Sequence, residues 1–339
     1  MDWQHDSAAA FNQRLGMPAA VYVAFFRFPF DNVELNNLDN FIAQVARQRG
    51  MALITLEPHD GLNAITPQIA SDLAILLATY NRRGIPVFVR FAHEMNGFWY
   101  PWSQQPKEYV RAFRALAYAI HRHAPLTAML WAPNYGGSHP FAGIRHDALP
   151  GSSNFQLLDT NMDGRIDLLD DMYTPYYPGD DAVDWVGMSL YHWGRKHPWG
   201  ENETPEEYSF VDRITGRYKG MNGDERTVPN FYRIYVEQHR KPMAITETAA
   251  LYNPAAVGAS GRKIKQAWWR QVFNQQVARD FPGIKMINWF EWKKFESEVG
   301  GVIDWRVTFD PEITKAFMND LPRQGLIFAT DLQGISIYQ

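Results

Sequence analysis

Two glutamates, each at the end of an apolar run, have the clearest potential for chemistry in this sequence. Glu94 follows the run PVFVRFA (86–92), and Glu247 ends the run MAITE (243–247). Such runs predict β-strands, and a carboxylate that a strand delivers into a cleft can act as an acid or a nucleophile. Paired carboxyl groups are what glycoside hydrolysis needs, because one protonates the leaving oxygen and the other attacks the anomeric carbon or positions water.

Aromatic side chains surround the first of these glutamates. The segment HEMNGFWYPW (93–102) follows the strand-like run, and the chain as a whole contains 12 Trp and 16 Tyr. Tyr and Trp suit ligands that are apolar on one face and hydroxylated at the rim. The expected partner is therefore a polysaccharide or an oligosaccharide.

The elements that must position the glutamates alternate along the chain. Strand-like runs lie at 19–26, 51–58, 86–92, 128–134, 185–191, 243–249 and 285–292, and helical patterns lie at 38–49, 66–83, 106–123, 229–240 and 262–280. Alternation over this length predicts an α/β fold, a single-domain (β/α)₈ TIM barrel over residues 1–339. Seven strands are plain, so an eighth is expected at residues 1–4, with the run GLIFATDL (325–332) as the alternative.

With residues 1–4 as strand one, Glu94 follows strand four and Glu247 ends strand seven, on opposite sides of the barrel mouth. The connections at 135–184 and 192–228 are longer than ordinary loops, and loops of such length in a compact domain are usually functional. Both follow the carboxyl ends of strands, where barrel enzymes place their active sites.

Four motifs resemble one known family in order and spacing. RFAHEMNGFWYPW, WAPN, YYPGDDAVDWVGMSLY and KPMAITETA are similar to segments of glycoside hydrolase family 26, and the resemblance covers roughly residues 20–310. It implies a retaining enzyme on a (β/α)₈ barrel, secreted from the cell. Endo-β-1,4-mannanase is the leading expectation, with β-1,3-1,4-glucanase and β-1,3-xylanase as alternatives. A barrel that binds carbohydrate without cleaving it is the alternative of another class.

The resemblance also implies roles for individual residues. Glu94 would be the acid/base, Glu247 the nucleophile, and Tyr191 the hydrogen-bond donor that orients the nucleophile. The remaining roles concern sugar binding: His93 at the cleavage subsite, Trp99 on the leaving-group side, and Trp289 as the platform under the cleaved sugar.

Further residues on the same face have two interpretations each. His59 is placed in the wall of a subsite, with a buried histidine as the alternative. Trp102 and Trp193 are candidate sugar platforms, with packing at the rim as the alternative. Glu57 is expected to pair with Arg90 in a structural role.

The segment DTNMDGRIDLLD (159–170) matches a calcium-binding loop. The predicted ligands are Asp159, Asn161, Asp163, Arg165 through its carbonyl, Asp167 and Asp170. Asp at position 12, where EF-hands carry Glu, and the flanking sequence both depart from a full EF-hand. We expect a structural calcium ion that the chemistry does not need, with a solvated acidic turn as the alternative.

Composition excludes several other classes. A net charge of −4 gives no reason to expect nucleic acid. The absence of cysteine excludes disulfides and thiol catalysis. The sequence contains no run of 18 apolar residues, so no membrane span is predicted. The first residues show no signal peptide. We expect a monomer, and residues alone do not decide between endo and exo action.

Overall fold

The computed structural model describes residues 3, 5–141, 143–145, 148–221, 223–322, 326, 328 and 329. Its centre is a seven-stranded parallel sheet with the strand order β1-β2-β3-β4-β5-β8-β9. The strands are β1 (Val21–Arg27), β2 (Met51–Glu57), β3 (Val87–Phe91), β4 (Thr127–Trp131), β5 (Trp185–Ser189), β8 (Met243–Thr248) and β9 (Ile284–Trp289). All seven predicted strands are confirmed.

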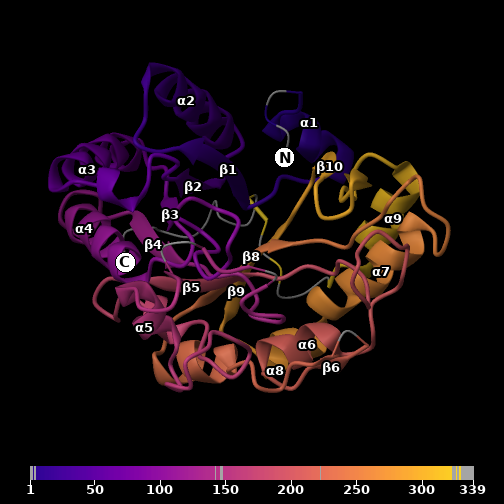
Figure 1. Ribbon diagram of the computed structural model, residues 1–339. Coiled ribbons are helices and arrows are strands. Elements are labelled where there is room, and N and C mark those ends of the chain that lie inside the picture. The colour runs from indigo at the N-terminus through magenta and orange to yellow at the C-terminus, as the bar shows by residue number, and fades with distance from the viewer. Residues whose placement is uncertain are drawn as a thin grey trace.

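Helices form a ring around this sheet (Figure 1). They are α1 (Ala8–Leu15), α2 (Asn32–Arg47), α3 (Pro67–Arg82), α4 (Pro106–His123), α5 (Ser153–Leu158), α6 (Ser209–Ile214), α7 (Gly261–Val272), α8 (Gln275–Asp280) and α9 (Pro311–Asp320). Short 3₁₀ turns η1 (Leu62–Ala64) and η3 (Thr174–Tyr176) and the π-helix η4 (Tyr232–Gln238) complete the set. Within the described ranges, no helix has the length and apolar character to cross a bilayer.

Local sequence accounts for the helix boundaries. Thr66 caps α3 by accepting a hydrogen bond from the amide of Ile69 at 3.2 Å, and Pro67 occupies the first helical position. Asp31 caps α2, which begins earlier than predicted. The helix predicted at 262–280 is two helices, α7 and α8, because Asn274 begins a new one by accepting the amide of Gln276.

The sheet curls so that its end strands approach each other. Cα atoms of β1 and β9 lie within 8 Å, and consecutive parallel strands with helices outside confirm the predicted barrel class. Leu53, Phe88, Leu130, Ala244 and Met286 form a buried cluster inside the curl. The apolar residues on the opposite side of the strands pack against the helices.

Neither predicted eighth strand is described as a strand. Of residues 1–4 only Trp3 is described, and it lies in a turn, where its indole donates to the carbonyl of Val23 at 2.8 Å. The alternative at 325–332 lies mostly outside the described residues, although the amide of Ala329 bonds the carbonyl of Pro18. Within the seven-stranded sheet, Glu94 therefore follows the third strand and Glu247 lies on the sixth; the predicted fourth and seventh counted residues 1–4 as strand one.

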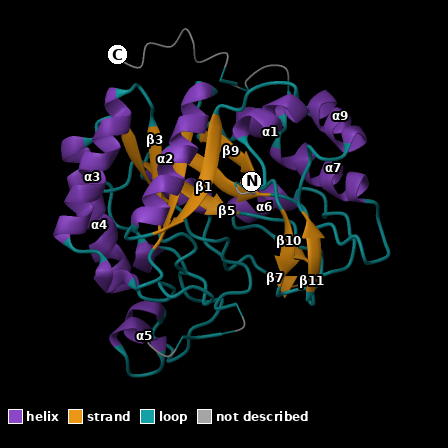
Figure 2. Ribbon diagram, turned by 90° about the horizontal axis from the view of Figure 1, so that it is seen from above, coloured by secondary structure: helices purple, strands orange, loops and turns teal. Residues whose placement is uncertain are grey.

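Additional elements follow the carboxyl ends of strands. A hairpin of β10 (Lys293–Glu296) and β11 (Gly301–Asp304) comes directly after β9, and a small hairpin of β6 (Lys219–Gly220) and β7 (Gly223–Asp224) lies in the long connection after β5. Figure 2 shows α5 and the β10–β11 hairpin on the same side of the sheet. The long connections thus build on the end of the barrel where the glutamates lie.

Candidate active site

A tight turn after β3 delivers Glu94 to the mouth of the barrel. Ala92 and Glu94 both have positive φ, 47° and 54°, which costs energy for residues other than glycine and is often found at functional sites. The amide of Glu94 donates to the carbonyl of Ala132 at 3.0 Å, just beyond β4. Gly97 has to be glycine, because a Cβ there would lie 2.5 Å from the ring of Trp99.

The environment of Glu94 favours its protonated form. Burial raises the pKa of its carboxyl to about 7, and the negative charge of Glu247 acts in the same direction. The opposing influences are the charge of Arg90 and hydrogen bonds from Ser189 and Trp99. The indole of Trp99 donates to Glu94 Oε2 at 3.0 Å, and this ring is 38% exposed. Glu94 can therefore hold a proton near neutral pH beside an exposed aromatic surface.

Glu247 accepts two strong donors at the end of β8. The hydroxyl of Tyr191 donates to Oε2 at 2.6 Å, and Arg90 Nη1 donates to Oε1. A register shift in the pairing of β5 with β8 places Glu247 opposite Ser189. Charge-assisted bonds of this kind stabilise an ionised carboxylate and fix its orientation.

One buried arginine links the two glutamates. Besides Glu247, Arg90 bonds the hydroxyl of Ser189 through Nη2 at 2.7 Å, and the charge of Arg90 also acts on the carboxyl of Glu94, whose pKa it lowers. Both glutamates thus interact with the same buried arginine of β3. The predicted pairing of Arg90 with Glu57 is wrong. Glu57 pairs with His59 instead, with 3.5 Å between Oε2 and Nε2.

The prediction from sequence did not find the link through Arg90 and Ser189. Arg90 stands four residues before Glu94 within a run whose other members are apolar, and a charge in such a run indicates a buried partner. That signal was present. Ser189 carried no comparable signal, because a small polar residue at the end of a strand is common.

Two of the predicted sugar-binding residues are too buried for that role. Trp102 is 0% exposed, and its indole donates to the carbonyl of His93 at 2.7 Å. His93 is 2% exposed, and its Nε2 lies 3.1 Å from the hydroxyl of Tyr100. Burial, followed by the charge of Arg90, lowers the pKa of His93, so its ring is neutral. The structure therefore does not support direct sugar contacts by either residue.

The other predicted aromatics differ in their surroundings. Trp289 is half-buried: its ring lies 6.4 and 6.0 Å from the rings of Trp269 and Phe317 in α7 and α9, and it also packs against the cluster that contains Trp305. Trp193 is half-buried beside Tyr191, at a ring distance of 6.3 Å. The roles of Trp289, Trp193 and the half-exposed His59 stay predictions.

The acidic loop 159–170 is closed by its own hydrogen bonds. Asp159 accepts the amides of Asp163 and Gly164 at 3.0 and 2.9 Å, and Asp170 accepts those of Thr160 and Asp167 at 2.7 and 2.8 Å. In the part of the chain that the structure describes, no group of three or more His, Cys, Asp or Glu side chains is arranged to hold a metal ion. Calcium ligation by this loop therefore stays a prediction.

Known proteins resemble this chain in sequence and in fold. Residues 30–164 match the profile of glycosyl hydrolase family 26, a segment that contains Glu94 but not Glu247. Endoglucanase H of Acetivibrio thermocellus is 23% identical over 242 residues, which are 69% of this chain and 20% of that protein. The chain thus spans about a fifth of the length of this curated relative.

Solved structures share the fold at low sequence identity. GH26C from Muricauda sp. MAR_2010_75 aligns with a TM-score of 0.58 and 14% identity over 95% of this chain and 83% of that one. A modular endo-β-1,4-mannanase from Cellulomonas fimi aligns with a TM-score of 0.57 and 15% identity over 94% of this chain and 67% of that one.

Fold and site together define a β/α barrel with a pair of linked glutamates at its mouth, the arrangement of a barrel glycosidase. Within that class, the sequence and structure matches confirm the predicted resemblance to glycoside hydrolase family 26.

Proposed function

We propose that this protein is a retaining glycoside hydrolase that cleaves internal bonds of β-1,4-mannan. The observation that supports this most is the pair of glutamates of different character that both interact with the buried Arg90. Glu94 keeps its proton to about pH 7, as an acid must, whereas Glu247 is held by Tyr191 and Arg90, as a nucleophile must be.

The steps of the reaction follow from these positions. Glu94 donates its proton to the leaving oxygen while Glu247 attacks the anomeric carbon, which forms a covalent glycosyl-enzyme and neutralises Glu247. Because the charge of Glu247 is one of the influences that raise the pKa of Glu94, that pKa falls at this stage. Glu94 then acts as the base that activates water, and hydrolysis of the ester restores both residues.

The sugar specificity is proposed from the relatives. The Cellulomonas fimi structure is that of an endo-β-1,4-mannanase, which favours mannan. The relative from Acetivibrio thermocellus is named an endoglucanase, so β-glucan is the second candidate. Because these polymers are large and outside cells, we also propose that the protein acts extracellularly.

Release of reducing sugar from mannan, mixed-linkage β-glucan and β-1,3-xylan, measured side by side, tests the proposal. We expect the fastest release from mannan and a loss of at least about 10³-fold in Glu94→Gln and Glu247→Ala, each with an unchanged fold by circular dichroism. Binding of mannan without any cleavage by the wild type would contradict the proposed activity and favour a non-catalytic barrel.

We also propose, on the motif alone, that loop 159–170 binds a structural calcium ion. Its ligands would be the side chains of Asp159, Asn161, Asp163 and Asp167 and the carbonyl of Arg165, with Asp170 closing the loop. The ion would stabilise the long connection after β4 and take no part in the proton transfers.

A further inference from the structure

Trp305 is a buried residue whose ring packs against the ring of Tyr191. Its ring is 1% exposed and lies 5.3 Å from the ring of Tyr191, with an angle of 63° between the planes. Tyr191 in turn places its hydroxyl 2.6 Å from Glu247. An edge-to-face contact of this kind restricts the rotation of both rings, so the position of Trp305 bears on the bond between Tyr191 and Glu247.

Trp305 is itself fixed through both its side chain and its backbone. The indole donates to Glu296 Oε1 at 2.7 Å. The carbonyl of Trp305 accepts the indole of Trp289 at 2.9 Å, and its amide donates to the carbonyl of Trp292 at 3.0 Å. The ring therefore has little freedom to move away from Tyr191.

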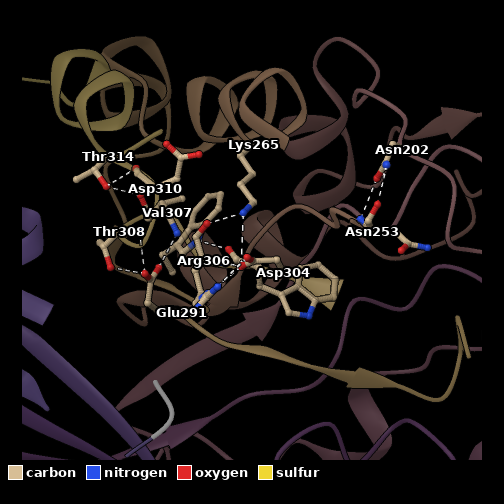
Figure 3. A network of polar contacts seen from close by, with 12 residues as sticks. Asn202, Asn253, Lys265, Glu291, Asp304, Arg306, Val307, Thr308, Asp310 and Thr314 are labelled. Atoms are coloured by element: carbon tan, nitrogen blue, oxygen red, sulfur yellow. Dashed lines mark hydrogen bonds and ion pairs between the residues drawn. The ribbon is translucent and has the colours of Figure 1, made fainter. Parts of the chain in front are cut away.

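A cluster of charged residues holds the chain on both sides of Trp305 (Figure 3). Arg306 donates to both oxygens of Asp304 at 2.9 Å. Lys265 of α7, which is 1% exposed, donates to the carbonyl of Arg306 at 2.5 Å and lies 3.9 Å from Asp304. On the carboxyl-terminal side of Trp305, the amides of Val307 and Thr308 donate to Glu291 at 2.8 and 2.9 Å.

Burying this charged cluster costs free energy that an apolar cluster in the same place would not cost. Burying charged groups requires that they lose their hydration, and apolar residues of the same volume are often at least as stable. Buried ionic groups are sometimes retained because they specify one geometry. Here, the geometry they specify is the path of residues 304–308, which carries Trp305.

We propose that Trp305 is a positioning residue that holds Tyr191 in the orientation in which its hydroxyl bonds Glu247. The cluster of Lys265, Glu291, Asp304 and Arg306 keeps Trp305 in place. This inference rests on the proposed function and extends it to a segment that lies outside the matched family profile.

The effect should be on the rate of the chemical step. A displacement of about 1 Å in a positioning group costs up to roughly 10²-fold in rate. Trp305→Leu should therefore lower kcat on mannan by roughly 10- to 100-fold, while KM changes by less than about 3-fold. Trp305→Phe keeps a ring but loses the bond to Glu296, and we expect an intermediate loss.

Trp269 provides a matched control. It is also 1% exposed, and its indole also donates to a carboxylate, Asp320 Oδ2 at 2.9 Å, but it packs in the helical layer against Phe317. Trp269→Leu should lower the melting temperature as much as Trp305→Leu does, while kcat stays within about 3-fold of the wild type.

A double-mutant cycle with Tyr191→Phe separates positioning from general stability. If Trp305 acts through the Tyr191 hydroxyl, Trp305→Leu should cost less than about 3-fold in kcat when Tyr191 is already Phe. An equal loss in both backgrounds, or an equal loss of kcat in Trp269→Leu, would overturn the inference. If Trp305→Leu fails to fold, Trp305→Phe enters the same cycle. A wild type that cleaves no polysaccharide would instead overturn the proposed function itself.

Discussion

At the scale of single residues, the site depends on two identical side chains that behave differently. Glu94 lies on a turn with positive φ, where burial and the charge of Glu247 both oppose its ionisation. Glu247 lies at the end of a regular strand and receives donors from Tyr191 and Arg90. The difference between the two carboxyl groups therefore comes from their surroundings, and it can be altered one partner at a time.

The first prediction concerns the charge of Glu247. Glu247→Gln removes one of the two influences that raise the pKa of Glu94, so that pKa should fall below its value of about 7. Titration of the glutamate carboxyl carbons by NMR measures it directly. In the wild type, the rate of hydrolysis should fall as pH rises through about 7, because the acid loses its proton.

Glu57→Gln is the control for this titration, because Glu57 also lies at the end of a strand, β2, but pairs with His59. It should change the pKa of Glu94 less than Glu247→Gln does. An unchanged pKa of Glu94 in Glu247→Gln would show that the two carboxyl groups do not interact.

The sequence was sufficient to place the two glutamates and Tyr191 at one end of the barrel, because Glu94 follows a strand-like run, Glu247 and Tyr191 each end one, and strand ends of a parallel sheet meet at one edge. It did not reveal which of the surrounding aromatics face the mouth. Trp102 is fully buried, whereas Trp99, three residues earlier, is 38% exposed. Which of these rings is exposed depends on local dihedral angles and on packing with residues far apart in the chain.

At the scale of elements, the chain after β9 closes the site from one side. The β10–β11 hairpin and the segment that follows it carry Trp305 to Tyr191, and α7 holds that segment through Lys265. Neither this hairpin nor α9 was predicted from the sequence, because both are short. Their positions are set by ionic and aromatic contacts between residues far apart in the chain, which a local pattern does not encode.

The second prediction concerns the buried lysine of this segment. Burial lowers the pKa of Lys265 from 10.5 to about 8. Between these values the unfolded chain binds more protons than the folded protein, so the free energy of unfolding should rise with pH in this window. Below pH 8 both states are protonated and the lysine adds no pH dependence. Lys265→Met should lack the rise, which is on the order of 3 kcal/mol.

Urea unfolding at several pH values from 7 to 10.5 measures this difference. Lys263→Met, which changes an exposed lysine of the same helix, is the control and should follow the wild type. Parallel pH dependence in the wild type and Lys265→Met would mean that Lys265 is not charged and buried as the structure has it.

At the scale of the whole molecule, the strands of the barrel position the two glutamates, and the long connections after the strands lie around them. Consecutive parallel strands bring Glu94 and Glu247 together although they are far apart in sequence. The fold class was predictable from the alternation of strand and helix patterns. The closure of the barrel was not, because no local pattern at either end of the chain identifies an eighth strand.

The third prediction concerns the acidic loop 159–170, which directly follows α5, a helix that lies away from the sheet (Figure 2). If the loop binds calcium, added calcium should stabilise the folded protein by mass action and so raise the melting temperature. At a calcium concentration 100-fold above Kd, the free energy of unfolding should increase by up to about 3 kcal/mol. Asp163→Ala should abolish this rise without removing hydrolysis. Identical melting curves with calcium and with a chelator would contradict calcium binding.

The most direct test of the proposed mechanism is the anomeric form of the product that azide gives with each glutamate variant. With a substrate whose leaving group needs no protonation, Glu247→Ala should be accelerated by azide and give the α-glycosyl azide, because azide then attacks in place of the missing nucleophile. Glu94→Ala should give the β-glycosyl azide, because azide attacks the covalent intermediate. Failure of azide to accelerate either variant, or the opposite anomers, would contradict the roles assigned to the two glutamates.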